Sequence, residues 1–392
     1  MTPAARVQAA IEILDMVIAA ARDNGPAADK IISDWFRTRR FAGSSDRRAM
    51  RELAYGAIRR CGEVPPSGRA AMLTLAKDDA SLVALFDGSP HAPLPIAEGE
   101  PQANSGTAPE WLEQALAASD IAGEEAEALL SRAPLDLRIN TLKAARDTLD
   151  LPAPGEATQA RHALRYPFGT PVEKWDAHQR GLIEIQDTAS QLACEVVAAS
   201  PGETVIDLCA GAGGKTLALS AAMENRGRII ACDIDRARLS RLAPRAARAG
   251  ATIIETMLLN PGGELAGLSE WMGKADAVMV DAPCSGTGTW RRNPEARWRL
   301  NTKQLARYAV AQAQLLDIAA QMVCPGGRLI YATCSLLDSE GDDQIAAFLT
   351  RHAQFRADPP TLAAGRPRGS GIRLTPFHDG TDGFFVARLL RI

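Results

Sequence analysis

The stretch that decides the fold lies near the middle of the chain and reads Thr204-Val205-Ile206-Asp207-Leu208-Cys209-Ala210-Gly211-Ala212-Gly213-Gly214-Lys215-Thr216. Its short apolar run is typical of a buried strand, and the glycines that follow permit a tight turn. A helix beginning near Lys215 would offer its unpaired main-chain amides to a ligand. The stretch therefore predicts a strand, a glycine turn and a helix that together bind a ligand.

The same pattern recurs towards the end of the chain. Apolar runs at 228–231, 277–280 and 328–332 alternate with helical patterns, one of them at 238–249. Near-continuous apolar strands that alternate with amphipathic helices indicate a parallel sheet covered on both faces. We therefore predict an α/β fold, a doubly wound Rossmann-like domain over 181–392. Because such sheets bind ligands beyond the carboxyl ends of their strands, the residues just after each strand are the candidates for chemistry.

The first part of the chain has a different pattern, with helices separated by turn signals. Pro3 can open a first helix that Asp23-Asn24-Gly25-Pro26 ends, and Ser44 or Ser45 can cap a later one. We predict a helical domain over 1–87, a Gly- and Pro-rich linker over 88–109, and a small α/β subdomain over 110–180 with a strand at 135–140.

Charge is unevenly distributed along the chain. Lys and Arg number 44 and Asp and Glu 47, which gives a net charge of −3. Residues 30–60 nevertheless carry nine basic side chains against Asp34, Asp46 and Glu52, a local balance of +6. A solvated face of a helical bundle and a surface that contacts RNA phosphates both explain such a run. The basic residues are Lys30, Arg37, Arg39, Arg40, Arg47, Arg48, Arg51, Arg59 and Arg60.

Composition excludes several classes of protein. The 392 residues allow two or three domains, and a hydrophobic fraction of 46% supports packed cores. Glu12, Asp15 and Arg22 interrupt the first apolar stretch, so it does not resemble a signal peptide, and no apolar run is long enough to span a membrane. Seven cysteines without a C-x-x-C pair suggest reduced thiols. We expect a soluble cytoplasmic protein, and a monomer.

Three interpretations of the glycine turn compete. A P-loop needs four residues between its first Gly and the Gly-Lys-Thr, but only Ala212 and Gly213 follow Gly211 there. A dinucleotide fold requires G-x-G-x-x-G, whereas Lys215 interrupts the run. The third interpretation is the nucleoside-binding turn of a methyltransferase, with Asp233 after the second strand accepting hydrogen bonds from ribose hydroxyls.

Two cysteines follow the other apolar runs. Asp281-Ala282-Pro283-Cys284-Ser285-Gly286 comes after one of them and Thr333-Cys334-Ser335 after the next. Cysteines in an α/β core are usually inert packing, but Pro, Ser and Gly are poor core fillers, and these two cysteines would face one crevice. Zinc is disfavoured because the five histidines are scattered without metal-site spacing.

These motifs resemble those of a known family. Asp207 to Thr216, Asp281 to Gly286, Arg291-Arg292-Asn293-Pro294 and Ala332 to Ser335 look like the RsmB/Sun (Fmu) family of RNA 5-methylcytosine methyltransferases. Supporting matches are 137–141, Gln186-Asp187 with Ser190, and the stretch 382–385. The segment 45–60 is similar to the NusB-like helical domain of the bacterial RsmB branch, so 1–87 is expected to bind RNA.

The resemblance implies a reaction and a set of site residues. The cofactor would be S-adenosylmethionine and the substrate a cytidine in RNA, most plausibly 16S ribosomal RNA, methylated at carbon 5. Cys334 would attack carbon 6 of cytosine, Cys284 would assist release, Asp281 would act on the ring nitrogen and Lys215 would orient the base or stabilise the thiolate. The cofactor-binding residues would be Cys209, Ala210, Gly211, Ala212, Gly213, Gly214, Lys215, Asp233 and Asp281.

Two positions depart from the family pattern. Gly211-Ala212 stands where the family usually has Ala-Pro, a change that keeps the loop small. Met257 stands where an Asp normally contacts the adenosine, so we expect adenine to be held by apolar packing or by a neighbour such as Asn260.

Basic and aromatic residues interleave beyond Cys284. We predict RNA contacts from Arg291, Arg292, Arg297 and Arg299, beside Trp290 and Trp298. In the alternative interpretation the tryptophans only pack against the domain. The competing functions are a catalytically silent RNA-binding ribosome assembly factor, a methyltransferase of tRNA, and a P-loop NTPase. No metal and no membrane is expected to take part.

Overall fold

The computed structural model describes residues 1–39, 42–77 and 79–392 and divides into two compact units. Unit 1 comprises Met1–Ser131 and Thr289–Asn301, and unit 2 comprises Arg132–Gly288 and Thr302–Ile392. Arg40 of the basic segment lies outside the described residues. The predicted division at 87, 109 and 180 stays a prediction, although residues up to 131 group with the N-terminal helices.

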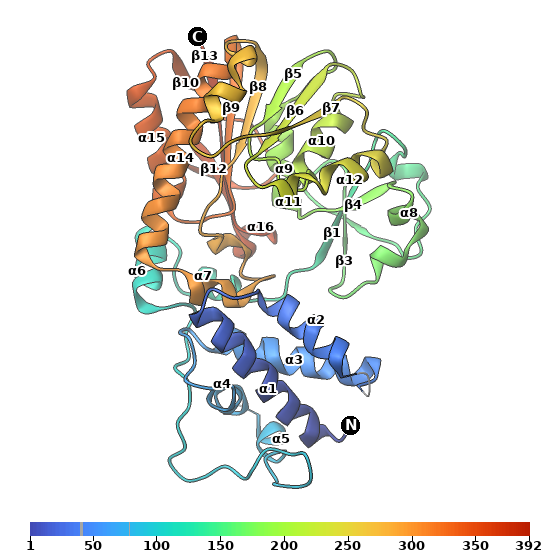
Figure 1. The fold of residues 1–392 in the computed structure, drawn as a ribbon, viewed down its shortest axis with the longest axis vertical. Helices are drawn as coiled ribbons and strands as arrows, with labels where there is room; N and C mark the ends of the chain where they lie inside the picture. The colour runs from blue at the N-terminus through green and yellow to red at the C-terminus, as the bar shows by residue number, and fades with distance from the viewer. Residues whose placement is uncertain (40–41, 78) are drawn as a thin grey trace. The chain divides into compact units, whose positions relative to one another are not determined.

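Unit 1 is built from helices (Figure 1). Pro3 is the first residue of the first helix, and the Thr2 hydroxyl caps it by accepting from the Ala5 amide. The predicted side-chain cap at Ser44 or Ser45 is wrong, because the extended backbone of an N-cap falls on Gly43 and the helix begins at Ser44. The helices are α1 (Pro3–Arg22), α2 (Ala28–Thr38), α3 (Ser44–Arg60), α4 (Gly68–Ala76), α5 (Ala80–Val83), α6 (Glu110–Ala118) and α7 (Glu124–Ala128).

The core of unit 1 is the apolar side of α1 packed against α2, α3 and α4. Ile13, Leu14 and Val17 of α1 are fully buried. Gly68, the first residue of α4, allows the backbone of α4 to approach the α1 backbone closely, and its amide donates to the Asp15 carboxylate at 2.6 Å. This helix contact organises the first 76 residues.

The Gly- and Pro-rich stretch 88–109 is irregular, as its composition predicts, yet it is held by specific contacts. Arg69 of α4 forms an ion pair with Glu100 and donates to the Leu94 carbonyl at 3.1 Å. Ser105 forms an isolated antiparallel β-bridge with Cys61 through main-chain hydrogen bonding. The stretch is therefore attached to unit 1 rather than extended into solvent.

Unit 2 contains the predicted doubly wound sheet. Its parallel part has the order β9-β8-β5-β6-β7, and an antiparallel part continues beyond β9 as β13, β12 and β11, with β10 pairing β13. The antiparallel part was not predicted. The strands are β5 (Thr204–Asp207), β6 (Arg228–Asp233), β7 (Ile254–Leu258), β8 (Ala275–Asp281), β9 (Val323–Thr333), β10 (Phe355–Ala357), β11 (Arg366–Arg368), β12 (Gly371–Leu374) and β13 (Phe384–Arg391).

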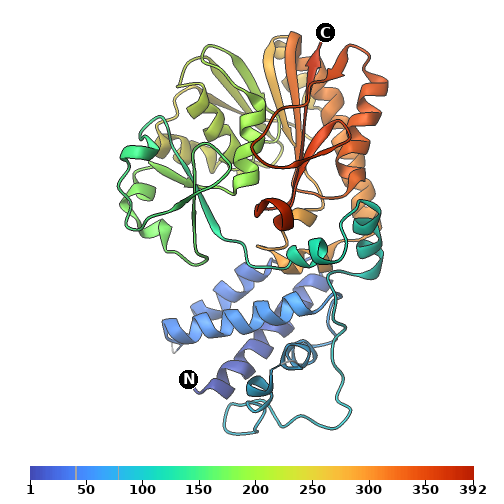
Figure 2. The ribbon, with the colours of Figure 1, turned by 180° about the vertical axis from the view of Figure 1, so that it is seen from behind.

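Helices cover both faces of this sheet, as Figures 1 and 2 show from opposite sides. On one face α9 and α10 pack on Val205, Ile229 and Met279, and on the other α14 and α15 pack on Ile206 and Val278. The fold class is thus confirmed. The helices of unit 2 are α8 (Asp176–Gln179), α9 (Thr188–Val197), α10 (Gly214–Ala222), α11 (Arg236–Leu239), α12 (Leu242–Ala249), α13 (Glu264–Gly267), α14 (Thr302–Met322), α15 (Asp342–Arg351) and α16 (Pro376–Asp379).

The helix predicted at 238–249 is interrupted. It is split into α11 and α12, and Pro244 lies in the first turn of α12. Proline has no amide hydrogen to donate and is tolerated only in a first turn, so a helix must begin just before it. Among the described residues, no helix is long and apolar enough to cross a membrane.

A second, antiparallel sheet has the order β2-β3-β1-β4. The predicted strand at 135–140 is its β1, and β4 pairs with it, so this sheet continues past the predicted boundary at 180. The Asp136 carboxylate is buried and accepts two hydrogen bonds from Arg165 and one from the Thr188 hydroxyl, which ties the sheet to α9. The strands are β1 (Leu135–Ile139), β2 (Glu156–Ala157), β3 (Ala163–Tyr166) and β4 (Ile183–Ile185).

Gly68→Ala tests the close approach of α4 to α1. A Cβ at this position would overlap the main-chain oxygen of Ile11, so the helices must separate. We expect a loss of about 1–3 kcal/mol in the free energy of unfolding, as for other overpacked sites. Urea denaturation measures it. Gly214→Ala is the matched control, since Gly214 is also the first residue of a helix and a Cβ there meets nothing within 4 Å; equal stability of the two variants would contradict the prediction.

Candidate active site

The carboxyl ends of β5, β6, β8 and β9 bring together the residues singled out in the sequence. Asp207 ends β5, Asp233 ends β6, Asp281 ends β8 and Thr333 ends β9. Because these strands are neighbours in the parallel part of the sheet, their ends lie along one edge. This edge is where a doubly wound sheet binds its ligand.

The glycine turn after β5 has the conformation that its sequence predicts. Gly211 and Gly213 have φ of +55° and +85°, the left-handed region that favours glycine. A Cβ at Gly213 would overlap the Leu242 side chain, so α12 closes the turn from behind. By contrast, nothing lies within 4 Å of a Cβ placed on Gly214, where α10 begins. The backbone thus leaves open space at the start of α10.

Carboxylates fix this turn to the neighbouring strands. The Thr216 hydroxyl donates to Asp207 Oδ2 at 2.6 Å, whereas Asp207 Oδ1 is buried without a hydrogen-bond partner. Burial raises the pKa of Asp207 to about 6. The Gly211 amide donates to Asp233 Oδ2 at 2.7 Å, and the Asp235 amide donates to Asp233 Oδ1. An orphaned buried oxygen and an open glycine cradle fit a small polar ligand with donor groups.

Lys215 and Asp281 form an ion pair across the edge of the sheet. Lys215 Nζ donates to Asp281 Oδ2 at 2.7 Å and lies 5.3 Å from the centroid of the Phe384 ring. Burial by itself would lower the pKa of Lys215, but the Asp281 carboxylate outweighs it and raises that pKa above its usual range. Lys215 is therefore held charged, with its position fixed by Asp281.

The two predicted cysteines meet. Cys284 Sγ lies 3.4 Å from Cys334 Sγ, and both side chains are partly exposed. The hydrogen bond to Cys334, burial and the charge of Glu340 raise the pKa of Cys284 well above its usual value. Cys284 therefore holds its proton and can share it with the Cys334 sulfur.

A polar network behind the cysteines joins their two loops. The Ser285 amide donates to Glu340 Oε1 at 2.9 Å, and the Ser285 hydroxyl donates to Glu340 Oε2. Gln312 of α14 donates to Glu340 Oε1 at 3.1 Å, and the Ser335 hydroxyl lies 3.2 Å from both Ser285 Oγ and Thr287 Oγ1. The buried Glu340 carboxylate thus holds the loop that carries Cys284.

Sequence reasoning missed Glu340, Gln312 and Phe384 as site residues. Phe384 belongs to the stretch 382–385, but nothing in the sequence indicates that its ring lies beside the Lys215 ammonium. An isolated Glu in Asp338-Ser339-Glu340 has the pattern of a solvated turn. Glu340 lies six residues after Cys334, and this nearness in the sequence is the only local signal that could have identified it.

The four arginines predicted to contact RNA belong to unit 1. Arg297 is fully buried and donates to the carbonyls of Ile58 and Cys61 at 2.7 and 2.8 Å. Arg299 donates to the Gly25 carbonyl at 2.8 Å and to the Pro26 carbonyl at 2.7 Å. These two side chains therefore hold unit 1 together.

The remaining members of this segment are also enclosed or engaged. Arg291 is 5% exposed, and the Arg59 guanidinium donates to its carbonyl at 3.3 Å. Trp290 is fully buried, and Trp298 donates from its indole nitrogen to the Cys61 carbonyl at 3.0 Å. Arg292 is half-buried. The packing interpretation of the tryptophans is the one that these contacts favour.

Met257 lies in β7 and packs partly buried against the core, while Asn260 is exposed just beyond the strand. In the register of the sheet, Cys232 pairs with Met257 and Asp233 pairs with Leu258. A role of Met257 or Asn260 in holding adenine stays a prediction. In the described part of the chain, no group of three or more His, Cys, Asp and Glu residues is placed to hold a metal ion.

A doubly wound sheet whose first turn is an open glycine cradle, with an acidic residue ending the next strand, defines the fold class of S-adenosylmethionine-dependent methyltransferases. The chain belongs to the family described as 16S rRNA methyltransferase RsmB/F, which matches residues 194–390. The predicted family and the predicted cofactor, S-adenosylmethionine, are thereby confirmed.

Individual relatives agree with this family. Ribosomal RNA small subunit methyltransferase B of Citrobacter koseri is 34% identical over 296 residues, which cover 72% of this chain and 66% of the relative. The protein of the same name from Thermus thermophilus is 39% identical over 217 residues, which cover 54% of this chain and 50% of the relative. The solved protein PH0851 is 26% identical, with a TM-score of 0.75 and 99% of both chains covered. The chain thus matches between half and about two thirds of the length of these curated relatives.

Gly213→Ala tests the glycine cradle as the cofactor site. The left-handed backbone and the overlap with Leu242 strain any side chain at this position, so the turn must shift. We expect S-adenosylmethionine to bind at least about tenfold more weakly in titration calorimetry, the equivalent of about 1.4 kcal/mol. Gly169→Ala, which has a similar left-handed backbone (φ +82°) but meets nothing within 4 Å and lies outside the turn, should bind like the parent protein. Unchanged affinity in Gly213→Ala would place the cofactor elsewhere.

Proposed function

We propose that this protein is an RNA (cytosine-5) methyltransferase that acts on 16S ribosomal RNA through a covalent adduct between Cys334 and cytosine. The observation that carries the proposal is the approach of two thiols to 3.4 Å beside the cofactor edge of the sheet. The membership in an rRNA methyltransferase family supports RNA as the substrate. The paired thiols support cytosine as the target base, because methylation at carbon 5 requires a thiolate nucleophile and a second group that assists its release.

Carbon 5 of cytosine is too weak a nucleophile to accept a methyl group directly. When the Cys334 thiolate forms a bond to carbon 6, electrons move towards the ring nitrogen and carbon 5 becomes nucleophilic. S-adenosylmethionine, when bound, supplies an electrophilic methyl group. The carbon 5 proton then passes to water, its bonding electrons return to the ring, and the carbon–sulfur bond breaks. The Cys334 thiolate leaves while the Cys284 thiol donates a hydrogen bond to it. One difficult step is thereby divided into two easier ones.

The contact between the two sulfurs allows Cys284 to donate a hydrogen bond to the Cys334 sulfur. We assign the attack to Cys334, because Thr333-Cys334-Ser335 resembles the motif of the RNA enzymes, and the release step to Cys284. The Glu340 network keeps Cys284 in place through Ser285, so Glu340 is a positioning residue.

Asp281 and Lys215 act as one charged pair in this proposal. Asp281 is about one third exposed and can reach a ligand while one of its oxygens accepts from Lys215. Charge that develops on the ring nitrogen would be stabilised by a proton at Asp281 or by the Lys215 ammonium. The pair thus complements the negative charge that the Cys334 attack generates.

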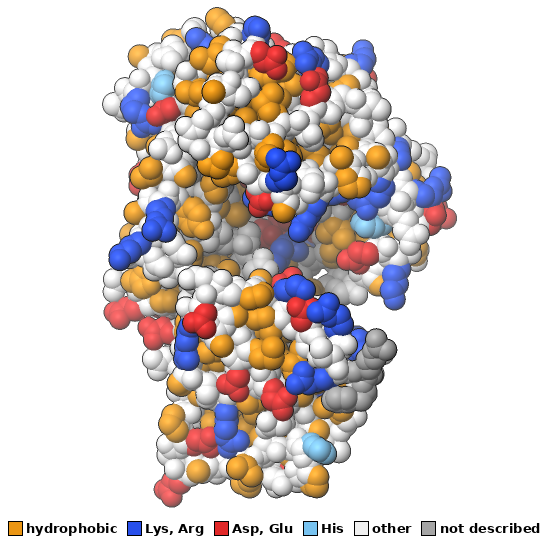
Figure 3. Space-filling model, in the orientation of Figure 1, with side chains coloured by type: hydrophobic (Ala, Val, Ile, Leu, Met, Phe, Trp, Pro, Cys, Tyr) orange, Lys and Arg blue, Asp and Glu red, His pale blue; other side chains and the backbone are white. Residues whose placement is uncertain are grey.

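RNA contacts are assigned to the exposed basic residues of α2 and α3, among them Arg37, Arg48, Arg51 and Arg60. On the face drawn in Figure 3, the described Lys and Arg side chains are interspersed with acidic and hydrophobic ones. Binding to RNA would therefore be local and sensitive to salt. Arg297 and Arg299 are left out because of their main-chain contacts. A monomer in the cytoplasm, where rRNA is matured, completes the proposal.

Cys334→Ala and Cys284→Ala separate the two roles. Without the attacking sulfur, methyl transfer should fall by at least about 10³-fold and no covalent RNA complex should form, because the adduct cannot start. Without Cys284, the adduct should form and persist. Transfer of labelled methyl groups to RNA and denaturing gel electrophoresis measure both effects. A trapped complex in Cys334→Ala would reverse the assignment.

Cys324→Ala is the matched control, since this partly exposed cysteine lies in β9 away from the pair and should leave both readouts unchanged. Nucleoside analysis of RNA methylated by the parent protein should show 5-methylcytidine. Methylated tRNA with unmodified 16S RNA would contradict the substrate assignment, and absence of transfer to either would indicate a silent assembly factor.

A further inference from the structure

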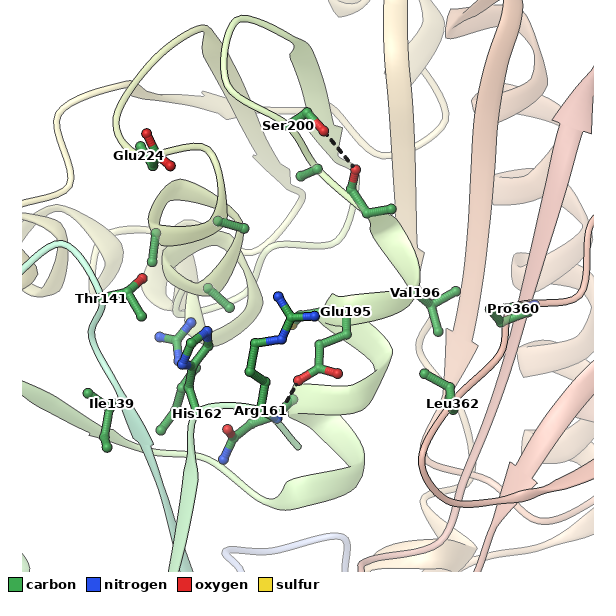
Figure 4. Close-up of a pocket in the computed structure, with 18 of the residues that line it drawn as sticks. Ile139, Thr141, Arg161, His162, Glu195, Val196, Ser200, Glu224, Pro360 and Leu362 are labelled. Carbon is green, nitrogen blue, oxygen red and sulfur yellow. Dashed lines mark hydrogen bonds between the residues drawn. The ribbon is translucent and has the colours of Figure 1, made fainter. Parts of the chain in front are cut away.

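Unit 2 contains a cavity of about 830 Å³ that the proposed reaction does not use. It is lined by β1, the turn before β3, α9, the end of α10 and the loop after β10 (Figure 4). Among the described residues, those of the glycine turn and the cysteine pair do not line it. The volume is that of a site for a small molecule or a nucleotide.

One wall of this cavity holds a buried guanidinium that no acidic side chain hydrogen-bonds, although the charge of Glu184 acts on it from a distance. Arg138 of β1 is only 6% exposed, and its Nε and Nη1 are buried without a hydrogen-bond partner. Its neighbour across the sheet is Glu184 of β4. The Glu184 carboxylate already accepts from Arg245 at 2.9 Å and from Arg248. A buried guanidinium left in this way is costly unless an anion joins it.

The adjoining wall is also positive. Figure 4 shows Arg161 and His162 between Ile139 of β1 and Glu195 of α9, with the Arg161 guanidinium extending into the cavity. Burial, followed by the charges of Arg161, Arg146 and Arg138, lowers the pKa of His162, which records the positive potential there.

The other charges that line the cavity have partners in the protein. Arg388 donates to the Asp358 carboxylate at 2.7 Å, and Glu224 accepts from Arg226 at 2.7 Å. Glu195 accepts from the Arg161 amide at 2.8 Å. A main-chain amide carries no net charge, so the Glu195 carboxylate faces Arg161 as an acidic neighbour. Among the described residues that line the cavity, Arg138 is the guanidinium that no acid hydrogen-bonds.

We propose that this cavity binds a phosphate group between Arg138 and Arg161. A phosphate in the cavity would lie beside the enclosed Arg138 guanidinium as a counter-ion, and it would accept hydrogen bonds directly from the exposed Arg161 guanidinium. The group is either a phosphodiester of the bound RNA, an alternative that rests on the proposed function, or the phosphate of a free nucleotide. Arg138 would then anchor a ligand at a point separate from the reacting base.

The first test is thermal unfolding of the full chain. At constant ionic strength, about 10 mM inorganic phosphate or cytidine monophosphate should raise Tm by about 2–4 °C relative to chloride, as expected for a millimolar site. Arg138→Met and Arg161→Gln should lose this shift. Without phosphate, Arg138→Met should unfold at the same or a higher temperature, because it replaces an unpaired buried charge by an apolar chain. Arg228→Gln, whose parent side chain pairs with Glu255 on the surface, should retain the shift.

The second test identifies the source of the phosphate. The affinity for a single-stranded RNA of about 20 nucleotides is measured by fluorescence anisotropy at several salt concentrations. If RNA supplies the group, Arg138→Met should reduce the slope of log K against log salt by about 0.7. An unchanged slope with a lost phosphate shift assigns the cavity to a free phosphate ligand. No Tm shift in the parent protein, together with equal slopes, would overturn the proposal.

Neither readout involves methyl transfer. A failed phosphate test would leave the proposed methylation intact, and a failed methylation assay would leave the phosphate site intact.

Discussion

The register between β8 and β9 is the constraint on which the site depends. Parallel pairing places Asp281 opposite Ala332, so the loops that begin after these residues start side by side. Cys284 comes three residues after Asp281, and Cys334 two residues after Ala332. A shift of one residue would turn every side chain of the strand to the other face and separate the thiols. The chemistry of the pair therefore rests on main-chain hydrogen bonds inside a buried sheet.

Much of this arrangement could be predicted from the sequence. The apolar runs around Val205, Ile229, Val278 and Leu329 are short, nearly uninterrupted by polar residues and bounded by turns or helical patterns, which makes buried strands easy to recognise. Once they are placed in a doubly wound sheet, the residues that follow them must converge at one edge. The glycine turn, the Lys215–Asp281 neighbourhood and the cysteine pair follow from that rule. The prediction of a cap at Ser44 was wrong because a shift of one residue in the start of the helix moves the N-cap to another side chain.

The parts that could not be predicted depend on contacts between distant segments. Arg297 looks like an RNA ligand in the sequence because arginine is usually exposed. It is buried because it satisfies carbonyls at the end of α3, more than 230 residues earlier in the chain. The antiparallel strands β11 and β12 have only three and four residues, and neither β12 nor the first half of β13 alternates between buried and exposed positions, so no pattern marks them. Arg138 shows the same limit, since only the fold reveals that the Glu184 carboxylate accepts hydrogen bonds from Arg245 and Arg248.

The segment Thr289–Asn301 belongs to unit 1, although it is inserted between β8 and α14 of unit 2. The ribosome therefore releases the helices of unit 1 long before it releases the side chain that closes them. At a synthesis rate of 5–20 residues per second, Arg297 is added on the order of ten seconds after the end of α3, whose carbonyls it hydrogen-bonds. The N-terminal helices leave the ribosome as an incomplete body, and their completion is coupled in time to the emergence of the loop that follows Cys284.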